Sequence, residues 1–322
     1  MAKDVTLIDV NSNKIYPRTF AKNVYMNDGV TTIDEQKADR ATVSQISNPN
    51  LVINGDFKVN QRGQTTYAGR GYTVDRWINS NNYTTTTIID TGVRVSASGG
   101  TAYLLQDIEN AFELYKGKTL TFSLKMNGTL YTTTGTMPTT IPTSTMGIGT
   151  AISFSGAAAT NIWLRTNGML RVQIGLNDGY SADIEYMKVE VGNIATPFSP
   201  RPYDEELALC ERYYQEMSFT TNSQIAGGIS NGSTCYAVLQ HKGNMRTTPT
   251  VTFTTPYNLY NGKSGGSITI NSIGIAVARE WQTTLSISHS TTDSGGVAVP
   301  AGSYQSLRMQ NGSKITFDAE IY

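Results

Sequence analysis

Six acidic residues could supply the pair of carboxylates that glycoside hydrolysis requires. In such hydrolases two carboxyl groups flank the sugar bond, one as an acid and the other as a base or nucleophile. The candidates by residue type are Asp75, Asp107, Glu109, Asp178, Asp183 and Glu185. Sequence alone cannot pair them, and acids in β-proteins of this size mostly occupy surface caps and turns. We therefore predict no catalytic residue and no enzyme.

Groups suited to covalent or metal chemistry are few. The chain has two histidines and two cysteines: His241, His289, Cys210 and Cys235. These four cannot form a zinc site with standard spacing. Neither histidine lies near a Gly-x-Ser-x-Gly elbow, so both are expected to be polar residues on a sheet surface. The glycine-rich runs 262–266 and 295–296 lack the features of a phosphate-binding loop and are expected to be loops. No cofactor is expected.

Aromatic side chains are better chemical candidates, because a ring combines an apolar face with polar edges and suits the face of a sugar. The candidate carbohydrate-binding residues are Tyr67, Tyr72, Tyr83, Trp163 and Tyr180. The first three have Thr, Gly and Asn neighbours and are expected to be exposed, whereas Trp77 is expected in the core. Further aromatic residues near turns of the C-terminal part are Tyr257, Tyr260, Trp281 and Tyr304.

Strands must position most of these residues. In 120–126 and 170–176 apolar residues alternate with mainly polar ones, which predicts one face against a core and one in water. Asn167-Gly168, between two such runs, predicts a hairpin turn. The stretch 131–150 is rich in Thr, Gly and Pro and is expected to be an edge strand and loop.

Composition supports the same fold class. The chain has 322 residues, enough for about two domains, and 44 of them are Thr, which favours strands over helices. Its formal net charge is zero, so nucleic acid is an unsuitable partner. It shows no leader pattern and no apolar run long enough for membrane insertion, which predicts synthesis in a cytoplasm. We predict an all-β protein.

Two helices interrupt this pattern. Residues 1–49 lack a core of their own and are expected to be an arm carrying a short helix over 32–46, whose start resembles a capping box at Thr32 and Glu35. A second helix is predicted from Asp204 to Met217, with an apolar stripe from Leu207 that includes Cys210 as a small core residue. Alternation then returns, which predicts a second β-sandwich over 203–322, with the helix as its link.

Several motifs resemble those of bacteriophage tail fibres and other receptor-binding fibres, over residues 50–322. The opening motifs are Leu51 to Phe57, Val59 to Gly63 and Asp75-Arg76-Trp77, and the closing ones are Val189 to Gly192, Ala195 to Phe198, Arg201-Pro202-Tyr203 and Glu206 to Tyr214. Met245 to Thr250 and Asp318-Ala319-Glu320 resemble the start and end of the C-terminal domain of these fibres.

This resemblance implies an antiparallel jelly-roll β-sandwich over 50–202 that binds carbohydrate, with its first and last strands side by side. Asp56 and Glu190 could then approach each other. A solvated or hydrogen-bonded pair is expected there, with a calcium site as the weaker alternative, because Ca²⁺ needs six to eight oxygens.

The resemblance also implies a function. We expect a structural virion fibre protein that forms a homotrimer, binds a bacterial surface polysaccharide, and attaches to other virion proteins through residues 1–49. Contacts between copies are expected around Ile33 and along the stripe from Leu207 to Met217. A head, collar or connector fibre with a mainly structural role is the alternative, and a glycan depolymerase is a weaker one.

Overall fold

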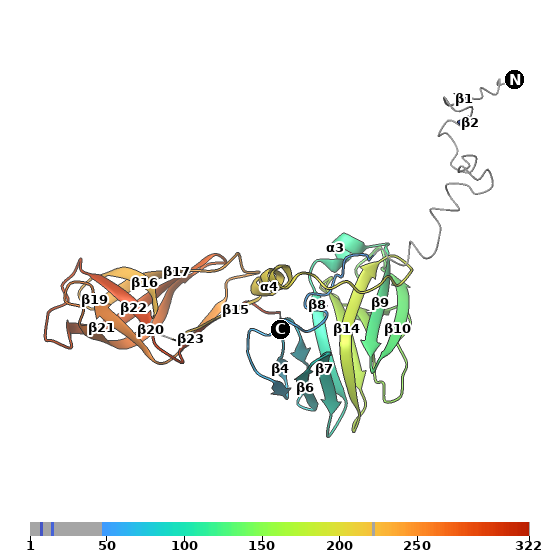
Figure 1. Ribbon diagram of the computed structural model, residues 1–322, viewed down its shortest axis with the longest axis horizontal. Coiled ribbons are helices and arrows are strands. Elements are labelled where there is room, and N and C mark those ends of the chain that lie inside the picture. Colours follow the sequence, from blue (N-terminus) through green and yellow to red (C-terminus); the bar gives the residue numbers. More distant parts are fainter. Residues whose placement is uncertain (1–6, 9–13, 16–46, 221–222, 322) are drawn as a thin grey trace.

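The computed structural model describes residues 7–8, 14–15, 47–220 and 223–321, and most of their regular structure is β (Figure 1). The predicted all-β class is therefore confirmed. Near the N-terminus β1 (Leu7–Ile8) pairs antiparallel with β2 (Lys14–Ile15). The helix predicted over 32–46 lies outside the described residues. In the described part of the chain, no helix is both long and apolar enough to cross a membrane.

The first domain is a sandwich of two six-stranded antiparallel sheets that share one apolar core. The first sheet has the order β10 (Thr129–Thr136), β9 (Thr119–Met126), β14 (Ser181–Val191), β7 (Gly92–Ala97), β6 (Thr84–Ile89) and β3 (Thr66–Ala68). The second has the order β11 (Met146–Ile148), β12 (Asn161–Leu164), β13 (Leu170–Leu176), β8 (Ala102–Ile108), β5 (Ile78–Asn79) and β4 (Gly71–Tyr72). Its jelly-roll connectivity stays a prediction.

Local features of the sandwich follow the sequence closely. Trp77 is completely buried, as predicted. The hairpin predicted at Asn167-Gly168 joins β12 to β13, and β10 is an edge strand. A short helix that the sequence pattern did not indicate, α3 (Ala111–Tyr115), lies between β8 and β9.

The opening segment of the sandwich, which is not a strand, lies along its closing strand β14. The first strand, β3, is separated from β14 by β6 and β7, so the expected pairing of first and last strands is wrong. The amide of Leu51 donates to the carbonyl of Val189 at 2.8 Å, and the amide of Met187 donates to that of Gly55 at 2.8 Å. The Lys188 side chain, 1% exposed, forms an ion pair with Glu190 at 3.1 Å and donates to the Pro197 carbonyl at 3.0 Å. The chain therefore enters and leaves the sandwich at one place.

The linking helix α4 (Tyr203–Glu211) is shorter than predicted. Acidic residues occupy its first turn, and Cys210 is completely buried, as expected. The stripe predicted to continue to Met217 instead enters β15 (Tyr214–Ser218), because Tyr214 pairs with Asp318 in a sheet. Cys210 and Tyr214 are buried within the same chain, whereas Leu207 and Met217 are half-buried, and the contact between copies predicted along this stripe stays a prediction.

The C-terminal domain is a closed barrel with an attached three-stranded sheet, in place of the predicted second sandwich. The barrel order is β16 (Ser223–Ser230), β17 (Thr234–Gln240), β21 (Gln282–Asp293), β20 (Ser267–Ala278), β19 (Tyr257–Asn261) and β22 (Tyr304–Met309). The small sheet has the order β15, β23 (Lys314–Asp318) and β18 (Thr250–Thr254). Alternation with a period of two is the same in both architectures. Closure depends on the pairing of β16 with β22.

Both histidines lie inside this domain, so their predicted place on a sheet surface is wrong. His289 is 2% exposed, and its Nε2 lies 2.9 Å from Ser230 Oγ. Its Nδ1 faces the backbone carbonyl of Ser290 at 2.8 Å. His241 packs against the ring of Phe317, with ring centres 4.6 Å apart. Ser230 and His289 are both buried, so a substrate cannot reach this pair, and their contact lies in the interior of the barrel.

A buried cluster of charged and aromatic side chains joins the two domains. We call it the joint cluster, and its members are Arg62, Asp75, Arg76, Tyr213 and Glu320. Arg76 is 2% exposed, forms an ion pair with Glu320, and donates to the carbonyl of Asp107 at 2.8 Å. Its guanidinium lies 3.5 Å from the ring centre of Tyr213. Arg62 bridges Asp75 at 3.3 Å and Glu320 at 3.5 Å. The end of the chain thus returns to the sandwich (Figure 1).

Candidate functional site

Tyr67, one of the predicted sugar-binding residues, belongs to the core. It is the middle residue of β3 and only 6% exposed. Its hydroxyl donates to Asn60 Oδ1 and accepts from the amide of Gln64 at 3.3 Å. Burial raises the pKa of this hydroxyl. The nearby Asp75 carboxylate raises it further, whereas the positive charge of Arg62 lowers it. The prediction that Tyr67 is exposed is wrong.

Two more candidates have limited access to a ligand. The Tyr72 hydroxyl donates to the carbonyl of Ile321, and its ring centre lies 5.2 Å from the Arg62 guanidinium. Tyr72 therefore contributes to the junction between the domains. Trp163, on β12, is half-buried, and its indole nitrogen is fully covered.

Tyr83 and Tyr180 retain the exposure that sugar stacking needs, at 48% and 44%. Each ring rests on a glycine. A Cβ added to Gly100 would lie 2.8 Å from the Tyr83 ring, and one added to Gly156 would overlap the Tyr180 ring. The absence of a side chain at these glycines lets the rings lie against the backbone. We call Tyr83 and Tyr180 the tyrosine platform.

Backbone hydrogen bonds hold both rings at one end of the sandwich. The segment 97–99 lies between them: the amide of Ser98 donates to the carbonyl of Tyr83 at 3.0 Å, and that of Ala97 donates to the carbonyl of Tyr180 at 2.8 Å. The amide of Gly99 donates to Asp178 Oδ1 at 2.8 Å. This end carries the end of β7 and the start of β14, away from the linker that leads to α4 (Figure 1).

Polar groups surround Tyr83. A shallow cavity of about 350 Å³ is lined by Arg70, Ser80, Asn81, Asn82 and Tyr83. The Asn81 amide is fixed by the carbonyl of Thr101 at 2.8 Å, whereas the Arg70 guanidinium has no partner in the described part of the chain. An exposed ring beside amides and a guanidinium can stack on a sugar and hydrogen-bond its hydroxyl or carboxylate groups.

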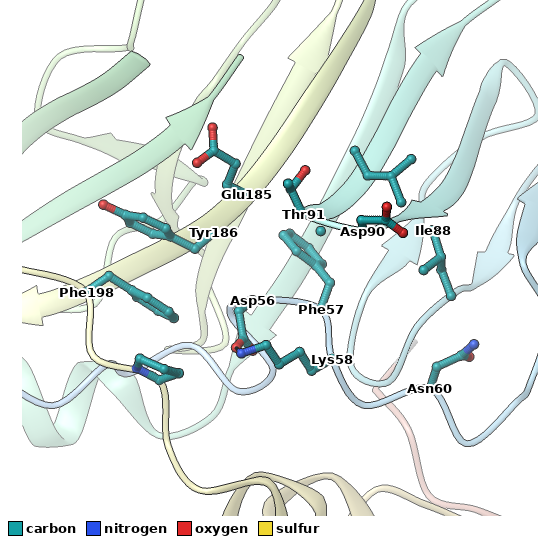
Figure 2. A pocket seen from close by; sticks show the side chains of 13 residues that line it. Asp56, Phe57, Lys58, Asn60, Ile88, Asp90, Thr91, Glu185, Tyr186 and Phe198 are labelled. Carbon is teal, nitrogen blue, oxygen red and sulfur yellow. Dashed lines mark ion pairs between the residues drawn. The ribbon is translucent and has the colours of Figure 1, made fainter. Parts of the chain in front are cut away.

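A larger cavity of about 620 Å³ lies near the middle of β14 (Figure 2). On one side the rings of Tyr186 and Phe198 stack with centres 4.3 Å apart. Burial raises the pKa of Tyr186, as do the Glu185 and Glu190 carboxylates. One face of each ring is covered by the other ring and is not available to a ligand. This cavity therefore offers less ring surface for stacking than its volume indicates.

The three carboxylates that line this cavity are engaged differently. Asp56 forms an ion pair with Lys58 at 2.9 Å, and Glu185 accepts from the amide of Gly128 at 2.8 Å. Asp90 forms no hydrogen bond or ion pair with any described residue. One free carboxylate does not supply the acid and base that glycoside hydrolysis needs.

The other acids considered for hydrolysis each have structural partners. Asp183 binds Arg94 through two hydrogen bonds, at 2.6 and 2.8 Å. Asp107 forms ion pairs with two arginines and Glu109 with two others: Arg165, Arg171, Arg212 and Arg246. Asp75 lies in the joint cluster and Asp178 supports the tyrosine platform.

The carboxylates considered for calcium are each paired with a lysine. Asp56 faces Lys58, whereas Glu190 is buried beside Lys188 and accepts from the amide of Thr196 at 2.8 Å. In the described ranges no three His, Cys, Asp or Glu side chains group closely enough to hold a metal. Each acid is therefore held by its own lysine, and the expected approach of the two carboxylates to each other stays a prediction.

Sequence reasoning missed the polar neighbours of the platform. Arg70, Asn81 and Asn82 stand in runs typical of turns, and nothing in those runs indicates that two loops meet beside Tyr83. The run of Asn residues before Tyr83 was the available signal. For Phe198 no signal existed, because its partner Tyr186 lies on another segment.

Comparison of this chain with family models, with curated proteins and with solved structures gives no match in any of the three.

Proposed function

We propose that this chain is a non-enzymatic fibre protein of a bacteriophage particle that binds a bacterial surface glycan through the tyrosine platform. The observation that carries the proposal is the pair of exposed rings, each lying on a glycine at the same end of the sandwich. Rings fixed in this way lose little conformational entropy when a sugar stacks on them. The Arg70 guanidinium suits a glycan that contains acidic sugars.

The motif resemblance supports the wider part of this proposal. Residues 1–49 attach the chain to other virion proteins, and the chain assembles as a homotrimer. Low charge favours such assembly, because identical copies with zero formal net charge do not repel one another. Light scattering on the full chain measures the number of copies.

Replacing Tyr83 and Tyr180 together by Ala should weaken glycan binding strongly. A well-placed aromatic contact contributes about 2 kcal/mol, which corresponds to roughly thirtyfold in affinity for each ring. The melting temperature should change little, because both rings are half exposed. Binding of the full chain to an array of bacterial polysaccharides, followed by titration with the best one, measures the effect.

Tyr236→Ala is the matched control, since Tyr236 is 51% exposed but lies on β17 of the barrel. It should bind the glycan as the wild-type chain does. If no polysaccharide binds the full chain, the glycan proposal is wrong and the connector role gains support. If a glycan binds but the double variant retains the affinity, the site lies elsewhere. Release of reducing ends from the polysaccharide would show a depolymerase instead.

A further inference from the structure

One strand of the C-terminal barrel has a long unpaired edge. The ladder between β19 and β20 consists of two pairs, Leu259 with Ile268 and Tyr260 with Ser267. On its other side β20 pairs with β21 as far as Ala278. From Ile270 to Ala278, therefore, one edge of β20 forms no ladder with any described strand. We call these nine residues the β20 edge.

The β20 edge lacks the charged residues and prolines that usually prevent strands from pairing with other chains. It contains no charged residue and no proline, and it is largely exposed on both faces: Ile275 and Val277 are 41% and 44% exposed. Monomeric proteins usually protect such edges with charges, proline or bulges. Bulges do occur here, yet Ser272 to Ile275 pair with β21 in unbroken register between them.

A second free edge lies in the same domain. β18 pairs with β23 alone among the described strands, so its outer edge is also open. Its five residues, Thr250–Thr254, are uncharged, and Val251 and Phe253 are only half-buried against the core. β19 follows β18 in the chain and pairs antiparallel with the start of β20. Beyond Ile268, β19 and β20 no longer pair. β15, on the other side of the small sheet, also pairs with β23 alone among the described strands, but it carries Glu216. The edges of β20 and β18 are therefore two open edges that carry no charge.

We propose that the β20 edge of one chain pairs with the β18 edge of a second copy of this chain. Each copy offers one edge of each kind, and a contact between two different surfaces of identical copies can repeat around a ring until it closes. Neither edge carries a charge that would select an oppositely charged foreign partner or repel an identical copy. The inference rests on the proposed assembly of this chain with its own copies and names the surface that mediates it.

The first test compares two lysine variants of the full chain by light scattering and circular dichroism. Ile275→Lys places a charge in the β20 edge and should convert the wild-type assembly to the 35.0 kDa chain, with the circular dichroism unchanged. Tyr236→Lys is the matched control: Tyr236 is 51% exposed, but it pairs with Ile229 of β16 on one side and with Ser286 of β21 on the other. It should keep the wild-type mass.

A second test does not depend on the folding of a charged variant. Ser272→Cys on β20 and Thr252→Cys on β18 are prepared separately, mixed and oxidised. The two native cysteines are buried, and burial raises the pKa of Cys235 to about 11, so they stay unreactive. We expect a disulfide-linked dimer in the mixture and little in either variant alone.

The outcomes separate the proposals. A wild-type mass of 35.0 kDa at micromolar concentration would overturn both self-assembly and this surface. An assembly that survives Ile275→Lys and gives no mixed disulfide would overturn the surface alone. A disulfide formed by Ser272→Cys by itself would show that two β20 edges meet, against the proposed pairing. None of these results bears on glycan binding at the tyrosine platform of an individual chain, so the two proposals can fail independently.

Discussion

Replacing Glu320 by Gln should lower the free energy of unfolding by ~3 kcal/mol and make the two domains unfold separately. The change leaves the Arg76 guanidinium buried without its counter-charge, and breaking a buried ion pair from one side is costly. In the wild-type chain burial would lower the pKa of Arg76, but Glu320 outweighs this effect and raises it. An arginine side chain keeps its proton in proteins, so the guanidinium of the variant cannot escape the cost by losing its proton. Calorimetry of the full chain should show two separate unfolding transitions for the variant. In the wild-type chain the transitions of the two domains should lie closer together in temperature.

Asp183→Asn is the control for this effect. Asp183 also binds an arginine, Arg94, with two hydrogen bonds, but the pair lies largely in solvent. Water and salt weaken such pairs, so the unfolding transitions should not change. Equal behaviour of the two variants would show that the joint cluster does not hold the domains together.

Replacing Asp75 by Asn should stabilise the protein at neutral pH and have little effect in acid. Burial raises the pKa of Asp75 to about 6 from 3.8, despite the opposing effect of Arg62. Between these two pH values the folded state binds more protons than the unfolded state, so this group makes the protein less stable as the pH rises. Two pKa units correspond to ~3 kcal/mol. The gain for Asp75→Asn should therefore grow from near zero at pH 4 to this value above pH 7.

Denaturant titrations of both chains across this pH range measure the difference. Glu216→Gln provides a control of opposite sign: burial would raise the pKa of Glu216, but hydrogen bonds from Lys314 and Ser218 lower it. That variant should be less stable than the wild-type chain by a constant amount above the ordinary pKa of Glu, and the difference should shrink as the pH falls below that pKa. A flat difference between Asp75→Asn and the wild-type chain would mean that Asp75 is solvated in solution.

Local patterns predicted individual elements well. The strand over 119–126, the turn at Asn167-Gly168 and the burial of Trp77 and Cys210 all depend on residues that are close in sequence. The alternation did not indicate that Thr121 and Ser123 would also be buried. The chain that follows β14 explains Thr121, whose hydroxyl donates to the carbonyl of Gly192 at 2.9 Å.

Features that depend on distant partners were not predictable in this way. Tyr67 sits among Thr and Ala in an alternating strand, but alternation does not tell which face turns inward. The joint cluster brings Glu320 to Arg76, which precedes it by 244 residues, and neither residue type marks such a contact. For the same reason the sequence indicated Tyr83 and Tyr180 as separate candidates and not as one platform.

The closeness of entry and exit in the sandwich has a mechanical consequence. Ser47 Oγ donates to the carbonyl of Pro197 at 2.7 Å, the amide of Asn48 donates to Thr196 Oγ1 at 3.0 Å, and Leu51 pairs with Val189 beside them. Tension applied between the segment before Ser47 and the barrel passes through these few bonds, which would open one after another. The two sheets lie outside the path of the force, so the tyrosine rings at their far end keep their geometry while the chain is under load.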